Sequence, residues 1–153
     1  MKKIVVLLMT LFTVVVCASA QKGEMGVGGQ LLYGDDSDIG IGARFQYNIL
    51  DQLRFAPSMN LFFPDNSDVT WFELNADIHY LFPVVDKLKL YPLGGLNLTR
   101  VSYKDNSDTE LGLNIGGGAQ YGVFSNLDLI GELKYVTGDA DQLVISAGVV
   151  FKF

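Results

Sequence analysis

The chain has little cysteine, little histidine and little charge. Its 153 residues include one Cys and one His, and 18% are charged, so neither a disulfide framework nor a thiolate metal site is available to it. Acidic residues outnumber basic ones by 17 to 11, which argues against binding to nucleic acid, because phosphates need a basic surface. Hydrophobic residues reach 49% and glycines number 17, which is too apolar for disorder and too rich in glycine for a helical bundle.

The first twenty residues have the three parts of a secretory signal peptide. Two lysines precede an apolar stretch at 4–16, and the small-residue motif Ala18-Ser19-Ala20 follows it. The apolar stretch is too short for a transmembrane helix, which needs about 20 residues. We therefore expect a signal peptide at 1–20, cleaved after Ala20, and a single domain at 21–153.

Beyond residue 20, apolar and polar residues alternate with a period of two, which is the pattern of half-buried strands. Clusters of Asp, Asn, Ser and Gly interrupt the alternation at regular intervals, as turns do. The pattern predicts eight strands, most of them longer than is usual in a soluble sheet. The predicted strands cover 24–33, 39–48, 53–63, 69–82, 87–102, 109–121, 127–137 and 142–153. In the fifth strand the alternation slips between Leu98 and Val101, and we expect a bulge after Gly94-Gly95.

The composition of the polar face indicates which side of the sheet is enclosed. A soluble barrel encloses its apolar face, whereas a membrane barrel encloses its polar face. Small residues crowd the polar face here, and a narrow lumen requires them while water does not. They are Gly26, Gly28, Gly40, Gly42, Ser58, Gly95, Gly112, Gly116, Gly118 and Ser146. Charges of both signs lie on the same face in nearly equal numbers, which predicts a network of paired charges inside the barrel. The residues assigned to this lumen network are Arg44, Arg54, Glu73, Asp77, His79, Glu132 and Lys134.

The apolar face carries aromatic residues near the strand ends and aliphatic residues between them, which is typical of the two aromatic girdles of a membrane barrel. An open sheet cannot lie in lipid, because its edge amides would be unsatisfied, so the strands must close. The predicted fold is therefore all-β, an eight-stranded antiparallel up-and-down transmembrane β-barrel. A secreted soluble barrel that binds small apolar ligands is the alternative.

These features resemble the small eight-stranded outer-membrane barrels of the outer membrane protein A and X type, which are grouped with porin-like β-barrel proteins. The resemblance extends over 21–153 and rests on the signal peptide, the strand count, the segment Tyr91-Pro92-Leu93-Gly94-Gly95-Leu96-Asn97 and the ending 147–153. It implies a location in the outer membrane of a Gram-negative-type bacterium, with outer-membrane lipid and lipopolysaccharide as neighbours. It also implies that Phe151 and Phe153 form the signal that the barrel-assembly machinery reads.

Two kinds of turn alternate along the chain. The turns that follow odd-numbered strands are acidic, and with the N-terminus in the periplasm all of them face outward. These acidic outer turns are 35–38, 64–68, 105–108 and 138–141. Weak binding of divalent cations is one interpretation of them, and ordinary turn formation by Asp, Asn and Ser is the other. Because the spacing of a calcium loop is missing, we expect no specific metal site.

The sequence offers little for catalysis. His79 is the only histidine and lies on the same face as Asp77, but no serine is placed to complete a triad, so we expect neither an enzyme nor a cofactor. Eight strands enclose a space only wide enough for side chains, which favours a plugged lumen. The predicted function is a structural and surface-interaction role in the cell envelope. A narrow porin-like channel for small solutes or ions is the alternative.

Overall fold

The computed structural model describes residues 2–6, 23–50, 52–65, 68–138 and 141–153. The predicted cleavage point after Ala20 and parts of three predicted turns lie outside the described residues. Within the described residues, no helix has both the length and the apolar character needed to cross a membrane.

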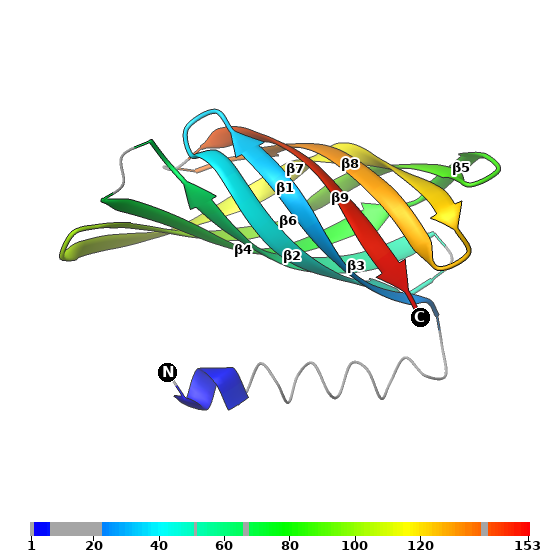
Figure 1. Ribbon diagram of the computed structural model, residues 1–153, viewed down its shortest axis with the longest axis horizontal. Helices are drawn as coiled ribbons and strands as arrows, with labels where there is room; N and C mark the ends of the chain where they lie inside the picture. The colour runs from blue at the N-terminus through cyan, green and yellow to red at the C-terminus, as the bar shows by residue number, and fades with distance from the viewer. Residues whose placement is uncertain (1, 7–22, 51, 66–67, 139–140) are drawn as a thin grey trace.

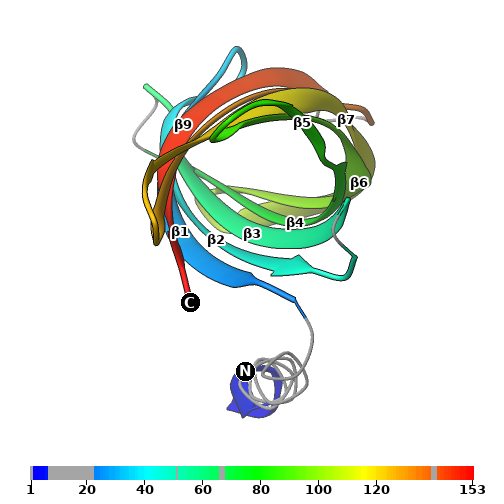
Figure 2. The same cartoon turned by 90° about the vertical axis from the view of Figure 1, so that its right-hand side faces the viewer.

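The described chain forms nine strands in a single sheet. The strands are β1 Met25–Gly34, β2 Asp38–Asn48, β3 Leu53–Phe63, β4 Val69–Tyr80, β5 Phe82–Val85, β6 Leu88–Tyr103, β7 Asn106–Phe124, β8 Leu127–Val136 and β9 Gln142–Lys152. Each strand pairs antiparallel with its neighbours. β1 pairs with β9 and β4 pairs with β6, so the sheet closes into a barrel (Figures 1 and 2).

β4 and β5 are two parts of one strand of the barrel. The register of this strand against β6 continues from the pair His79 and Leu93 to the pair Phe82 and Leu90 without a shift. The interruption is at Leu81, which this register places opposite Tyr91 and next to Pro92, a residue with no N–H to donate to the ladder. The barrel therefore has eight antiparallel strands, and the predicted fold is confirmed.

The bulge expected in β6 is absent, and that prediction was wrong. β6 pairs with β4 and with β7 without a register shift through Gly94 and Gly95. The alternation changes near the outer end of β6 instead, where Arg100 is exposed and Val101 is partly buried. Near that end the outward face of β6 approaches the membrane boundary, so contact with lipid no longer selects for apolar residues. Register shifts occur instead at two turns of the opposite end, between Pro83 and Val85 and next to Phe124.

The hairpin formed by β6 and β7 is longer than the sequence predicts. The expected turn at 105–108 is a tighter turn at Lys104 and Asp105, in which Lys104 has a φ of 51°. Asn106 therefore already belongs to β7 and pairs with Tyr103. The pairing of β7 with β8 begins only at Asn114, so the outer part of β7 extends past β8, and the hairpin projects at the left of Figure 1.

The barrel is apolar outside and polar inside. On β8, the side chains of Leu129 and Leu133 are 46% and 52% exposed, whereas Glu132 and Lys134 are 5% and 4% exposed. The other strands alternate in the same way, and most buried side chains are polar or charged. This is the reverse of a soluble protein and the arrangement of a barrel surrounded by lipid.

Candidate functional site

The barrel interior holds all seven residues assigned to the lumen network. Each is almost completely buried, with a relative exposure of at most 5%. They are Arg44 on β2, Arg54 on β3, Glu73, Asp77 and His79 on β4, and Glu132 and Lys134 on β8. They fall into four contact groups along the lumen instead of one continuous chain of charges.

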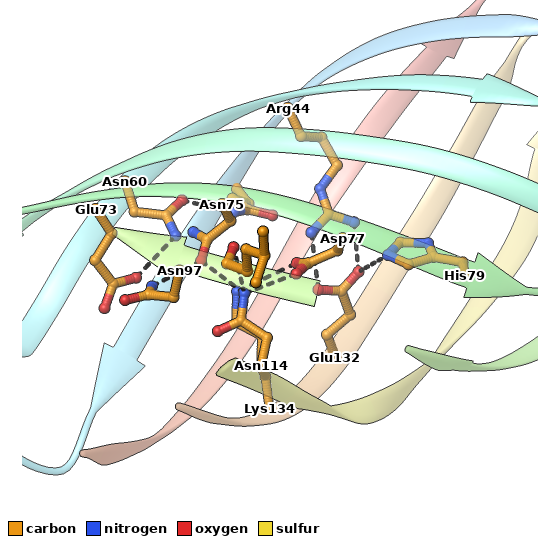
Figure 3. Close-up of polar contacts among 12 residues, drawn as sticks. Arg44, Asn60, Glu73, Asn75, Asp77, His79, Asn97, Asn114, Glu132 and Lys134 are labelled. Carbon is orange, nitrogen blue, oxygen red and sulfur yellow. Dashed lines mark hydrogen bonds and ion pairs between the residues drawn. The ribbon is translucent and has the colours of Figure 1, made fainter. Parts of the chain in front are cut away.

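The central group is built on an ion pair between opposite walls. Arg44 donates two hydrogen bonds to the Glu132 carboxylate, Nη1 to Oε2 at 2.5 Å and Nη2 to Oε1 at 2.8 Å (Figure 3). Tyr91 donates its hydroxyl to Oε2 of Glu132 at 2.6 Å. His79 Nε2 lies 3.9 Å from the same oxygen. The Glu132 carboxylate therefore has a cation and a hydroxyl donor in direct contact, which a buried charge requires.

Tyr91 is the member of this group that the sequence analysis missed. Its ring stacks on His79 with centroids 4.3 Å apart and planes 12° apart, and the Arg54 guanidinium lies 5.2 Å from the centre of the same ring. Its exposure is 2%. The alternation of β6 could have shown that Tyr91 faces the lumen, because Tyr91 is an even number of residues from the inward-facing Asn97 and an odd number from the outward-facing leucines.

The second group joins an ion pair to a layer of amides. Lys134 Nζ lies 3.5 Å from an Asp77 carboxylate oxygen. Asn114 donates to Asp77 at 2.7 Å and to Asn75 at 2.8 Å, and Asn97 donates to Asn75 at 2.8 Å (Figure 3). The layer spans β4, β6, β7 and β8, so the polar contacts connect strands that lie far apart in the sequence.

The third group contains Glu73, which is bound by amides instead of a cation. Its carboxylate accepts hydrogen bonds from Gln142 at 2.8 Å and from Asn60 at 3.3 Å, and Gln30 donates to Asn60 at 2.8 Å. Among the described residues it forms no ion pair. The sequence analysis placed Glu73 inside the barrel, but the paired charge expected there is missing within the described part of the chain.

The outer end of the lumen is apolar. Leu32, Phe62, Val136 and Val144 form a buried cluster, and Trp71 packs against it. These residues belong to five different strands, close to the acidic outer turns. They narrow the outer mouth with hydrocarbon side chains, which the polar-lumen interpretation of the sequence did not predict.

The fourth group contains Arg54 and lies toward the inner end. Arg54 donates to Gln46 at 2.7 Å and to Gln120 at 2.5 Å. Gln120 in turn donates to Asp128, and Lys152 Nζ lies 3.3 Å from Asp128. The amide of Gln120 thus links the Arg54 guanidinium to the Asp128 carboxylate through hydrogen bonds.

The chemistry of this interior is that of a packed polar core. The nearest carboxylate that contacts His79 is Glu132 and not Asp77, so the two residues singled out by the sequence do not form a dyad. Across the part of the chain that the structure describes, no group of three or more His, Cys, Asp or Glu side chains is placed to hold a metal ion.

A closed antiparallel barrel with an apolar outer surface and a polar interior is a transmembrane β-barrel. The family described as "Outer membrane protein beta-barrel domain" matches residues 4–153. The chain belongs to this family, whose members are proteins of the outer membrane of Gram-negative bacteria.

Solved structures of outer-membrane barrels have the same fold. The N-terminal barrel domain of OprF from Pseudomonas aeruginosa is 20% identical, with 86% of this chain and 98% of that chain covered and a TM-score of 0.73. Neisserial surface protein A is 23% identical, with 85% and 96% covered and a TM-score of 0.69. Ail, the attachment invasion locus protein of Yersinia pestis, is 16% identical, with 87% and 100% covered and a TM-score of 0.58. A search of curated protein sequences finds no match.

Proposed function

We propose that the protein is an integral outer-membrane barrel whose lumen is plugged by side chains, with a structural and surface-interaction role and no enzymatic activity. The observation that carries this proposal is the central ion pair of Arg44 and Glu132, which joins opposite walls of the barrel with two hydrogen bonds. An eight-stranded barrel has an interior only wide enough for side chains, so such a pair occupies the path that a solute would take.

Opening this path is energetically costly. Separating the two charges leaves each of them buried without a partner, which costs about 3–5 kcal/mol in comparable sites. The apolar cluster that contains Leu32 and Phe62 adds a second barrier at the outer mouth, because hydrophobic constrictions exclude hydrated ions. Both features support a silent barrel over a channel.

The outer end supports a role in surface interactions. The β6–β7 hairpin extends past β8, because the strand pairs of β7 with β8 begin only at Asn114. A projecting hairpin edge is a surface on which another extended chain can pair. The names of two similar structures, a surface protein and an attachment protein, are consistent with this role.

The remaining parts of the proposal concern insertion and neighbours. A signal peptide at 1–20, cleaved after Ala20, directs export, and Phe151 and Phe153, which are 52% and 61% exposed, provide the signal for the barrel-assembly machinery. Outer-membrane lipid and lipopolysaccharide surround the barrel. The acidic outer turns bind divalent cations weakly, and no cofactor is required.

Single-channel recording in planar bilayers tests the plugged lumen. The refolded protein is expected to give no stepwise conductance, while the triple variant Arg44→Ser/Glu132→Ser/Phe62→Ala, which removes the central pair and opens the apolar cluster, is expected to conduct. Heat-modifiable gel mobility verifies that both proteins are folded barrels. Steady conductance by the unmodified protein would instead establish the alternative, a narrow channel, for which the cavity of about 380 Å³ at the inner mouth is the supporting observation.

A further inference from the structure

The cavity at the inner mouth combines cationic and apolar walls. It has a volume of about 380 Å³, within the range of sites for small molecules. Lys87, Lys89 and Lys152 line it, together with a single acid, Asp128. The turn before β6 and the ends of β7, β8 and β9 form this mouth, at the end of the barrel where the C-terminus lies (Figure 2).

The charge of the cavity is unbalanced. Asp128 already pairs with Lys152, whose Nζ lies 3.3 Å away, and the half-exposed Glu24 lies 3.8 Å from the same nitrogen. Lys87 and Lys89 form no ion pair among the described residues, although both line the cavity. Two ammonium groups are therefore available to an anion, and a phosphate is a suitable one, because lysine binds phosphate as a point charge.

The wall beside these lysines is apolar. Val123 and Phe124 line the same cavity and are 37% and 67% exposed. The other two inner turns carry similar exposed pairs, Ile49-Leu50 and Val84-Val85, with exposures of 45% to 63%. The outer turns carry aspartates at the corresponding places. A rim of exposed aliphatic and aromatic side chains is stable where it meets acyl chains and headgroups, so the inner mouth lies at the level of the membrane interface.

We propose that this cavity binds the headgroup of an anionic phospholipid from the inner leaflet. Lys87 and Lys89 contact the phosphate, and an acyl chain packs against Val123 and Phe124. Basic pockets at the membrane boundary recognise anionic headgroups in this way. The inference rests on the membrane orientation of the proposed function, with the acidic turns outside.

The affinity for lipid can be measured by native mass spectrometry of the refolded protein in detergent, titrated with phosphatidylglycerol or with phosphatidylcholine of the same acyl chains. We expect phosphatidylglycerol to bind about tenfold more tightly, a difference of about 1.4 kcal/mol. The variant Lys87→Gln/Lys89→Gln should lose this preference. The matched control Arg100→Gln/Lys104→Gln removes two positive charges from the outer hairpin and should retain it.

Two further measurements separate a lipid site from a simple anion site. Glycerol 3-phosphate, a phosphate monoester that carries no acyl chain, should bind at least tenfold more weakly than phosphatidylglycerol. Phe124→Ser, which leaves both lysines in place, should weaken binding of phosphatidylglycerol several-fold and leave binding of glycerol 3-phosphate unchanged.

The proposal is overturned by equal affinity for the two lipids, by equal losses in the inner and outer charge variants, or by glycerol 3-phosphate binding as tightly as the lipid. None of these results depends on conductance, so failure of the lipid site and failure of the plugged lumen remain distinguishable.

Discussion

The guanidinium of Arg44 and the carboxylate of Glu132 meet inside the barrel through two hydrogen bonds of 2.5 and 2.8 Å. Their side chains are 3% and 2% exposed. The two residues are 88 positions apart in the sequence and lie on β2 and β8, with β1 and β9 between these strands in the sheet. The pair can therefore form only in the closed barrel. Closing the sheet gives each of these two buried charges its partner.

Removing one partner of this pair should destabilise the barrel strongly. Glu132→Gln leaves the Arg44 charge buried without a counterion, and we expect a loss of about 3–5 kcal/mol in the free energy of unfolding, measured by urea titration in lipid vesicles. Glu24→Gln is the matched control, because Glu24 is 49% exposed and 3.8 Å from Lys152, and it should cost about 1 kcal/mol or less. Equal effects of the two substitutions would mean that the central pair does not support the fold.

The hydroxyl of Tyr91 should contribute less than the ion pair but measurably. Tyr91→Phe removes the 2.6 Å hydrogen bond to Glu132 and leaves the ring on His79, so we expect a loss of about 1.5–3 kcal/mol. A double-mutant cycle of Tyr91→Phe and Glu132→Gln should show coupling, because both substitutions act on the same contact. Strict additivity in that cycle would show that the hydroxyl does not act through Glu132.

A glycine inside the barrel should tolerate a methyl group less well than one outside. A Cβ at Gly118 would lie 2.6 Å from the Tyr91 hydroxyl and 2.8 Å from Glu132 Cγ. These two side chains cannot easily move away, because a hydrogen bond holds them to each other. Gly118→Ala should therefore destabilise by about 1–3 kcal/mol. A Cβ at the outward Gly131 has no neighbour nearer than 3.9 Å, so Gly131→Ala should be neutral or stabilise by about 0.4–1 kcal/mol. If unfolding titrations showed that Gly131→Ala destabilises the barrel more than Gly118→Ala, the assignment of the two glycines to the outer and inner faces would be wrong.

The cost of a charge on the outer surface should depend on membrane depth. Leu133 faces outward near the middle of β8, so Leu133→Arg should lower the free energy of unfolding by about 2–4 kcal/mol. Leu111 is 70% exposed and lies on the part of β7 beyond its last pair with β8, so Leu111→Arg should cost about 1 kcal/mol or less. Similar costs at both positions would contradict the placement of the outer hairpin beyond the membrane.

The sequence predicted the strands and their facing because a single physical constraint, lipid on one side, imposes a strict alternation. Residues such as Glu132 and Lys134 could be placed inside from the alternation of β8 alone. The partners of these residues could not be predicted, because the contact between Arg44 and Glu132 depends on the register of four neighbouring strands in the closed barrel. Interactions at that separation leave no local pattern in the sequence.

The misplacements have physical causes as well. Tyr91 was overlooked because aromatic residues usually face lipid in such a barrel, whereas here its hydroxyl has a buried carboxylate to contact. The bulge at Gly94-Gly95 was inferred from Val101, but that residue lies near the outer mouth, where lipid no longer fixes which side chains face outward. The turn near Lys104 was placed too late because Asp, Asn and Ser residues that favour turns continue into the edge of β7.

Quenching of tryptophan fluorescence by brominated acyl chains tests the orientation of the two faces most directly. The only tryptophan, Trp71, packs against the apolar cluster inside the outer mouth, so the unmodified protein reconstituted in brominated phosphatidylcholine should show little quenching. The variant Trp71→Phe/Leu133→Trp, with its indole on the outer surface of β8, should be strongly quenched. Strong quenching of Trp71 together with weak quenching at position 133 would contradict a polar interior surrounded by an apolar, lipid-facing wall.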